Sequence, residues 1–97
     1  MYEIKFTPEA FDDLAMLQKY DQSRIVAATD SELSHEPDRQ TRNRKRLRPN
    51  KLAEWVLRVN TFRVFYDILF DSGIVKVVAV GVKKGRDMFI CGEKFGL

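Results

Sequence analysis

The sequence predicts an α+β fold in which an N-terminal strand and two helices pack on one face of an antiparallel sheet. Apolar and polar residues alternate over residues 2–6, which is typical of a short, half-buried strand. Helix-start signals come next, and three alternating runs separated by turn residues fill residues 54–80. A chain of 97 residues has room for one hydrophobic core, so we expect a single domain over residues 1–97.

The residues after the first strand predict a capped helix. Thr7 can accept hydrogen bonds from the free amides at the helix start, and Pro8 suits the first helical position. Glu9, Asp12 and Asp13 add negative charge near the positive end of the helix dipole. The predicted apolar stripe consists of Phe11, Leu14, Ala15 and Leu17.

A second helix is predicted to begin with Asp21 as its N-cap and to end before Pro37. Its predicted inward residues are Ile25, Ala28, Thr29 and Leu33. The acidic residues of both helices are interpreted as helix-start and solvent-exposed residues.

The connection over residues 37–51 is strongly basic. Seven of the thirteen residues from Arg39 to Lys51 are basic and none is acidic. Arginine presents a planar fork of donors suited to phosphate oxygens, so this run predicts contacts to RNA. The predicted RNA-binding residues of the run are Arg44, Lys45, Arg46 and Arg48. A loop that is merely solvated is the alternative.

The second half of the chain predicts an antiparallel meander. The predicted strands span residues 55–59, 62–70, 74–80 and, more weakly, 88–90. Asn60 and Thr61 form the first predicted turn, and Asp71, Ser72 and Gly73 form the second.

A two-residue first turn places Arg58 opposite Arg63 across the hairpin. Like charges directly opposite each other on a sheet are unfavourable, and an anion bound between them would remove the conflict. Two alternatives stay open. The register could slip by one residue, or Glu54 and Asp67 could compensate the charges.

Three basic groups are predicted to converge on one groove. Arg58 and Arg63 point to the sheet face away from the helices, and Phe65 lies among them as a platform on which a base could stack. The residues predicted to join them after the third strand are Lys83, Lys84 and Arg86. The arginine-rich connection leads into the same meander.

The charges are divided unevenly along the chain. Residues 1–38 carry nine acids and three bases, a balance of −6. Residues 39–97 carry fourteen bases and five acids, a balance of +9. This asymmetry predicts a polyanionic partner for the basic half, without choosing among RNA, DNA and an acidic protein.

Composition argues against several other classes of protein. Cys91 and His35 are each the single residue of their type, so we predict no disulfide, metal site, cofactor or Ser-His-Asp chemistry. No run approaches 18 apolar residues, and the first residues lack the pattern of a signal peptide. We therefore expect a cytoplasmic protein with no membrane partner.

Four segments resemble the RelE/ParE superfamily of toxins from bacterial and archaeal type II toxin–antitoxin modules. They are Arg-Leu-Arg-Pro (46–49), Trp-Val-Leu-Arg-Val (55–59), Phe-Arg-Val-Phe-Tyr-Asp (62–67) and Val-Val-Ala-Val-Gly-Val-Lys-Lys-Gly (77–85). The resemblance covers nearly the whole chain, and its most specific part is the pattern over residues 57–67. That pattern separates the branches of the superfamily poorly.

The resemblance implies a RelE-like microbial ribonuclease-type fold and a toxin held inactive by a cognate antitoxin that wraps around it. RelE-like members are ribosome-dependent nucleases that cut mRNA without metal, by promoting attack of the 2′-hydroxyl on the adjacent phosphate. ParE-like members instead inhibit DNA gyrase. We favour the mRNA endoribonuclease, with mRNA and the ribosome as partners. A gyrase inhibitor and a non-cleaving antitoxin-binding module are the alternatives.

The resemblance also implies roles for particular residues. Arg63 matches the phosphate-holding arginine of the nucleases, and Lys83 matches a second basic residue that supports the strained phosphate. Phe89 stands where many members carry a tyrosine, while Glu54 and Val56 stand where they carry lysines. The predicted catalytic set is Arg63, Lys83, Lys84 and Glu54, with Phe89 as a further RNA contact.

Overall fold

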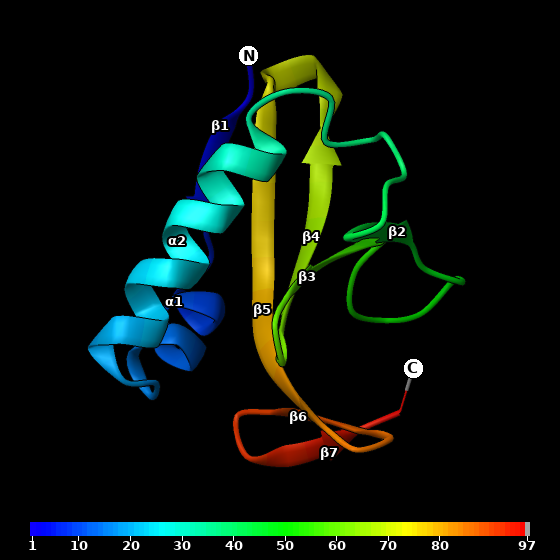
Figure 1. Cartoon of the computed structure of the whole chain (residues 1–97). Helices are drawn as coiled ribbons and strands as arrows, with labels where there is room; N and C mark the ends of the chain where they lie inside the picture. Colours follow the sequence, from blue (N-terminus) through cyan, green and yellow to red (C-terminus); the bar gives the residue numbers. More distant parts are fainter. Residues whose placement is uncertain (97) are drawn as a thin grey trace.

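The computed structural model describes residues 1–96 and has the predicted α+β architecture (Figure 1). The elements are β1 (Glu3–Phe6), α1 (Pro8–Ala15), α2 (Lys19–Leu33), β2 (Arg44–Arg46), β3 (Trp55–Val59), β4 (Phe62–Leu69), the 3-10 turn η1 (Phe70–Ser72), β5 (Ile74–Lys84), β6 (Asp87–Ile90) and β7 (Glu93–Phe95). The strands β2 to β7 lie side by side in chain order, each antiparallel to the next.

The strand β5 has partners along both of its edges. On one edge β4 pairs antiparallel with residues 74–82. On the other edge, β1 pairs in parallel with residues 74–77, and β6 pairs antiparallel with residues 81–84. The N-terminal strand is therefore part of the sheet, and its pairing with β5 makes the sheet mixed rather than purely antiparallel.

The helix α1 starts as predicted. Thr7 Oγ1 accepts a hydrogen bond from the Ala10 N–H at 3.1 Å, and Pro8 occupies the first helical position. Its predicted apolar stripe is only partly correct. Leu14 is buried, whereas Ala15 is exposed and Phe11 is 63% exposed.

A buried carboxylate on α1 covers the part of the β5 edge that lies between β1 and β6. Asp13 Oδ2 accepts a hydrogen bond from the Val80 N–H at 3.1 Å, and Asp13 is only 6% exposed. A buried backbone N–H needs an acceptor, and here the acceptor comes from a helix rather than a neighbouring strand. The interpretation of Asp13 as a solvent-exposed helix-start residue was therefore wrong.

The helix α2 begins earlier than predicted. Gln18 is its N-cap, so Asp21 lies within the first turn and does not cap the helix. The side chain of Gln22 donates a hydrogen bond to the carbonyl oxygen of Leu17, just before the N-cap, at 2.8 Å. The predicted inward residues Ile25, Thr29 and Leu33 are buried and Ala28 is half-buried.

The main core lies between the two helices and the sheet. Its fully or nearly buried members are Ala10, Leu14, Ile25, Leu33, Trp55, Leu57, Val64, Tyr66, Ile68, Val75, Val77 and Val80. The hydroxyl of Tyr66 donates to the Pro37 carbonyl oxygen at 2.8 Å, and burial raises the pKa of this phenol. This bond ties the end of the helical segment to the middle of β4.

A second, smaller core lies on the opposite face of the sheet. Phe65 is 0% exposed there and packs with Ala53 and Ala79. The connection after β2 covers it through Leu47 and Leu52, and the second core also includes residues of β6. The prediction of an exposed stacking platform at Phe65 was wrong, because Leu47 and Leu52 cover this side chain on the second face of the sheet.

The ends of the meander differ from the predicted ones. β4 ends at Leu69 and leads into η1, whose C-cap Gly73 has a φ of 65°. β5 continues to Lys84, four residues beyond the predicted end at Val80. The predicted strand at residues 88–90 exists as β6, and the hairpin that it forms with β7 was not predicted.

Candidate nucleic-acid interface

The β3–β4 hairpin has the predicted register. Asn60 lies in the turn with a φ of 55°, and Arg58 faces Arg63. A slipped register is therefore excluded as an explanation of this like-charge pair. The pair must be tolerated by the folded chain or stabilised by something that binds it.

The two carboxylates considered as compensating charges are engaged elsewhere. Glu54 Oε2 lies 3.4 Å from Arg46 Nη2, and Asp67 Oδ1 accepts a hydrogen bond from the Glu54 N–H at 2.8 Å. Among residues 1–96, no ion pair includes Arg58 or Arg63. The arginine pair therefore has no anionic partner within the described chain.

The guanidinium of Arg63 is held by the turn that precedes it. Its Nη1 donates to the carbonyl oxygens of Asn60 at 2.7 Å and Phe62 at 2.9 Å. Partial burial and the neighbouring charge of Arg58 lower the pKa of Arg63 from its ordinary value. Two backbone contacts fix one side of the fork and leave its other donors for a ligand.

Lys83 joins the arginine pair from β5. Arg63 is paired with Gly81, and Lys83 lies two residues further along the strand, so it points to the same face. The Lys83 N–H donates to the Thr61 carbonyl oxygen at 2.7 Å, which places Lys83 beside the hairpin turn.

These side chains surround a shallow hollow of about 260 Å³, which we call the basic basin. Its lining residues are Arg42, Asn43, Lys45, Val56, Arg58, Arg63 and Lys83. Five of the seven carry a positive charge and none carries a negative charge, so the basin is suited to an anion. Sequence-distant groups from the connection, the hairpin and β5 thus meet at one place.

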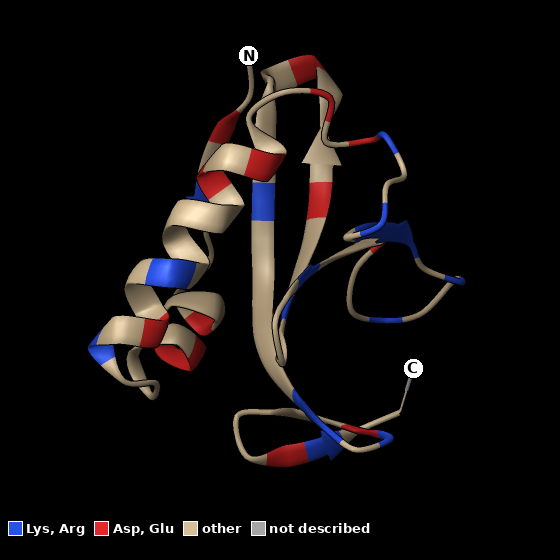
Figure 2. Ribbon diagram, viewed as in Figure 1, with Lys and Arg blue, Asp and Glu red and all other residues tan. Residues whose placement is uncertain are grey.

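Positive and negative charges are distributed unevenly over the molecule. Figure 2 shows lysine and arginine along the connection that carries β2 and at the far end of β5, whereas much of the acidic colour lies on α1 and α2. Most of the acidic residues of the first half therefore lie on the helices, away from the basic basin.

The arginines of the connection have different partners and do not all lie at the basic basin. Arg44 is only 9% exposed, and its Nη1 donates to the carbonyl oxygens of Glu32 at 2.8 Å and Glu36 at 3.0 Å. Arg46 pairs with Glu54 and lies over the Trp55 ring at 6.0 Å. Only Lys45, of the four residues predicted to bind RNA here, lines the basic basin.

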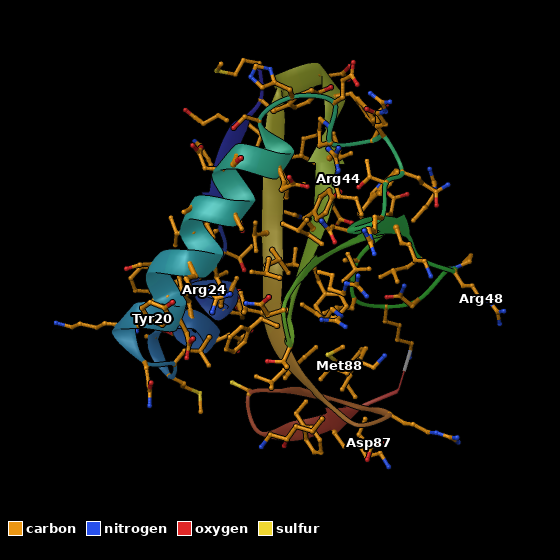
Figure 3. The ribbon with its side chains drawn as sticks, in the orientation of Figure 1. Tyr20, Arg24, Arg44, Arg48, Asp87 and Met88 are labelled. Atoms are coloured by element: carbon orange, nitrogen blue, oxygen red, sulfur yellow. The ribbon has the colours of Figure 1, made fainter. Side chains whose placement is uncertain are left out.

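Arg48 and Arg86 lie away from the basic basin. Figure 3 shows Arg48 at the tip of the connection, pointing away from the sheet. Arg86 is exposed in the turn between β5 and β6. Neither lines the basin, so any contact that they make to a ligand lies outside it.

Lys84 and Phe89 lie together on the other face of the sheet. The Nζ atom of Lys84 is 5.7 Å from the centre of the Phe89 ring. Both line a small hollow with Asp13 and Cys91, next to α1. The Asp13 carboxylate beside Cys91 raises the pKa of that thiol. Strand alternation therefore separates Lys84 from Lys83, although the two residues are adjacent in the sequence.

Three residues that line the basic basin were absent from the predicted set: Arg42, Asn43 and Val56. Arg42 and Asn43 precede β2, and the Arg58 N–H donates to the Asn43 carbonyl oxygen at 2.7 Å. Arg42 belongs to the basic run, so its charge was visible in the sequence. Its position was not, because it depends on the pairing of β2 with β3.

Proton-transfer groups are scarce near the basic basin. Glu54 lies just before β3 and four residues before Arg58, which corresponds to about 13 Å of extended chain, and it is already paired with Arg46. Tyr66 is buried in the main core. None of the residues that line the basin is a carboxylate, a histidine or a tyrosine. The basin can hold and stabilise negative charge more readily than it can move a proton.

Residues 1–96 also bear on metal sites and on membrane spans. They contain no group of three or more His, Cys, Asp and Glu side chains in an arrangement that could hold a metal ion. None of the helices there is both long enough and apolar enough to cross a membrane.

Comparisons with known proteins identify the family. The sequence model of a family described as the ParE toxin of type II toxin–antitoxin system, parDE, matches residues 4–85. A chain of the RelBE2 toxin–antitoxin complex from Mycobacterium tuberculosis is 28% identical, with a TM-score of 0.72 over 84% of this chain and 98% of that chain. A chain of the archaeal RelE–RelB complex from Pyrococcus horikoshii OT3 has the same fold, with 21% identity and a TM-score of 0.68 over 88% of this chain and 97% of that chain.

No curated protein matched the sequence. The family match nevertheless spans most of the chain, and it includes the β3–β4 hairpin and every residue that lines the basic basin. The predicted resemblance to the RelE/ParE superfamily is confirmed, and the chain belongs to the ParE toxin family of type II toxin–antitoxin systems.

Proposed function

We propose that this toxin binds the sugar–phosphate backbone of single-stranded RNA in the basic basin and promotes cleavage of mRNA on the ribosome. The observation that carries the proposal is the uncompensated pair of Arg58 and Arg63, with Lys83 beside it. Guanidinium forks bind phosphate oxygens with two parallel hydrogen bonds, and a phosphate between them relieves their mutual repulsion.

The proposed chemistry is attack of a ribose 2′-hydroxyl on the adjacent phosphorus, with departure of the 5′-oxygen. The phosphorane gains negative charge during this step, and preorganised cations stabilise it. Arg63 is the best placed of these cations because two backbone carbonyls already fix its orientation. Lys83 and Arg58 provide further positive charge at the same hollow.

Few groups near the basic basin can transfer a proton, so the catalytic acid and base are expected to come from outside it. A general base for the 2′-hydroxyl and an acid for the leaving oxygen come from the ribosome–mRNA complex or from water. We therefore expect the isolated toxin to bind naked RNA but to cleave it very slowly. Cleavage becomes efficient only on translating ribosomes.

Inhibition of DNA gyrase is the second candidate function. Two observations favour it: the matching family is that of ParE toxins, and no carboxylate, histidine or tyrosine lines the basin. In this case the basin would contact a phosphate backbone or an acidic protein surface without breaking a bond in RNA.

Mapping of transcript ends separates the two candidates. Wild-type toxin and Arg63→Ala are expressed to equal levels without an antitoxin, and the 5′ ends of ribosome-bound transcripts are sequenced. The nuclease predicts new ends within reading frames for the wild type and their loss in Arg63→Ala. Unchanged transcript ends, together with gyrase-cleaved DNA, would instead establish the second candidate.

We also propose a cognate antitoxin as partner, since the two similar structures described above are of toxin–antitoxin complexes. An exposed apolar groove of about 730 Å³ lies between β1, α1 and α2. Its lining includes Ile4, Phe6, Phe11, Leu14 and Val26. Exposed apolar surface of this kind is typical of a protein–protein contact, so an apolar antitoxin segment is expected to occupy the groove.

A further inference from the structure

The side chain of Arg44 connects the basic connection to the end of α2. Its Nη1 donates to the carbonyl oxygens of Glu32 at 2.8 Å, Glu36 at 3.0 Å and His35 at 3.5 Å. The last carbonyls of a helix lack partners within the helix and carry the negative end of its dipole. Figure 3 shows Arg44 near this end of α2, in contrast to the outward-pointing Arg48.

The backbone around Arg44 is fixed at the same time. Arg44 is paired with Leu57 of β3, and the Thr41 N–H donates to the Arg44 carbonyl oxygen at 3.0 Å. The Nε atom of Arg44 donates to Thr41 Oγ1 at 3.4 Å. Residues 41–45 are therefore held against both α2 and β3.

The residues on either side of Arg44 form one wall of the basic basin. Arg42 and Lys45 both line the hollow that also contains Arg58, Arg63 and Lys83. Five cations around one small hollow repel each other while no anion is bound. A wall that carries two of them would move outward into solvent if nothing held it in place.

We propose that Arg44 is a positioning residue that holds Arg42 and Lys45 at the basic basin and so sets the affinity of the basin for RNA. The proposal rests on the proposed function, in that the basin is taken to bind RNA. Arg44 itself does not touch the ligand, because its guanidinium is buried and directed at three backbone carbonyls.

Binding of a non-cleavable probe measures the effect. The probe is a fluorescein-labelled, 2′-O-methylated single-stranded RNA octamer, titrated by fluorescence anisotropy at several salt concentrations. Arg44→Met removes the hydrogen bonds from Arg44 to the backbone carbonyls, and Arg39→Met is the matched control. Arg39 is exposed in the same connection and forms only an exposed ion pair with Glu36 at 3.4 Å. Both substitutions remove one positive charge.

The salt dependence distinguishes positioning from direct contact. Each phosphate contact to a single strand contributes about 0.7 to the log–log slope. Arg44→Met is expected to lower the slope by about 1.4, because Arg42 and Lys45 are both lost from the basin. Arg39→Met should leave the slope unchanged. A fall of only about 0.7 with Arg44→Met would point to one direct contact and overturn the proposal.

Double-mutant cycles provide a readout that a general loss of stability would not produce. Lys45→Met is expected to weaken binding in the wild-type background but by less than about twofold in the Arg44→Met background. Arg63→Met should weaken binding equally in both backgrounds, since the hairpin holds Arg63 independently. Full retention of the Lys45→Met effect in the absence of Arg44 would contradict the proposal. If Arg44→Met does not fold, Arg44→Lys takes its place, which keeps the charge but not the planar fork.

Amide hydrogen exchange tests the positioning role of Arg44 separately from RNA binding, because it needs no ligand. Arg44→Met should speed exchange over residues 41–46 and leave β4 and β5 protected. If wild-type toxin fails to bind RNA, the proposed function is wrong, but hydrogen exchange still tests whether Arg44 positions residues 41–46. Unchanged exchange over residues 41–46 would show that Arg44 does not position them.

Discussion

Adjacent residues on β5 show how strand alternation divides the basic charge. Lys83 lines the basic basin, while Lys84 lies on the helix side of the sheet beside Phe89. In the sequence the two lysines form one basic pair, and both belong to the predicted catalytic set. In the folded chain only Lys83 can approach a phosphate held by Arg63.

Paired alanine substitutions test this separation. Lys83→Ala is expected to reduce toxicity strongly, with a loss of about tenfold or more in RNA affinity or cleavage, since a charge-assisted hydrogen bond contributes about 1.5–3 kcal/mol. Lys84→Ala removes the same charge from the opposite face and should retain most of the toxicity. Growth inhibition at equal expression compares them. Equal loss from both substitutions would mean that the basin is not the functional face.

The buried phenol of Tyr66 predicts a pH dependence of stability. Burial raises the pKa of Tyr66 in the folded chain, whereas a tyrosine in an unfolded chain has a pKa of about 10. The stabilisation by Tyr66 is therefore complete below pH 10 and is lost as the pH rises towards the folded pKa. The free energy of unfolding of the wild type relative to Tyr66→Phe should fall by about 1.4 kcal/mol per pH unit above pH 10.

Urea unfolding at pH 8, 10 and 11 measures this difference. Below pH 10 the wild type should be more stable than Tyr66→Phe by about 0.5–1.5 kcal/mol, the contribution of the hydrogen bond to Pro37. The comparison cancels the titration of lysines and arginines, which both proteins share. A stability difference that does not change with pH would mean that Tyr66 ionises equally in both states.

At the level of elements, one buried carboxylate hydrogen-bonds α1 to β5, in addition to the apolar packing of Ala10 and Leu14. Asp13→Ala leaves the buried N–H of Val80 without an acceptor, and we expect a loss of about 1–3 kcal/mol in the free energy of unfolding. Asp13→Asn keeps a carbonyl acceptor and should recover part of this loss. Asp12→Ala, an exposed neighbour on the same helix, should change stability by less than about 0.5 kcal/mol.

Thermal and urea unfolding of the three variants test the role of Asp13. Near-equal stability of Asp13→Ala and Asp12→Ala would show that water or another group satisfies the Val80 N–H. The same edge of β5 is occupied by β1 before this point and by β6 after it. The carboxylate therefore completes an edge that two separate strands leave open.

At the level of the whole molecule, the two candidate binding surfaces lie on different sides of the sheet. The apolar groove is formed by β1, α1 and α2, while the basic basin lies on the face away from the helices. An antitoxin that only fills the groove leaves the basin open. An antitoxin that neutralises the toxin by competition must also reach the basin, with a segment rich in acidic and apolar residues that orders on binding.

Titration of RNA into the toxin–antitoxin complex decides between these modes. We expect mutual exclusion, with weaker antitoxin binding to Lys83→Glu because charge reversal in the basin repels an acidic segment. Lys84→Glu is the matched control and should bind the antitoxin almost normally, since Lys84 faces away from the basin. Simultaneous binding of RNA and antitoxin would instead indicate that the antitoxin acts from the groove and blocks access to the ribosome by its bulk.

Local patterns in the sequence determined the start of α1, the register of the β3–β4 hairpin and the toxin family. The cap at Thr7 and the turn at Asn60 depend on neighbouring residues, so the positions of α1 and of the facing Arg58 and Arg63 could be predicted. The family resemblance likewise resides in contiguous segments of chain. For these features, interactions between residues close in sequence are sufficient.

The tertiary structure alone decided which residues of the basic half face a ligand and which hold the fold. Arg44, which the sequence predicts to contact RNA, is buried against the carbonyls of α2, and Phe65, predicted to be a stacking platform, lies under Leu47 and Leu52. Asp13 is buried because the edge of β5 needs an acceptor. An arginine, phenylalanine or aspartate looks the same in the sequence whether it becomes buried or exposed. Burial of these residues depends on the unpaired backbone groups and apolar surface of distant segments, and a single sequence does not reveal those contacts.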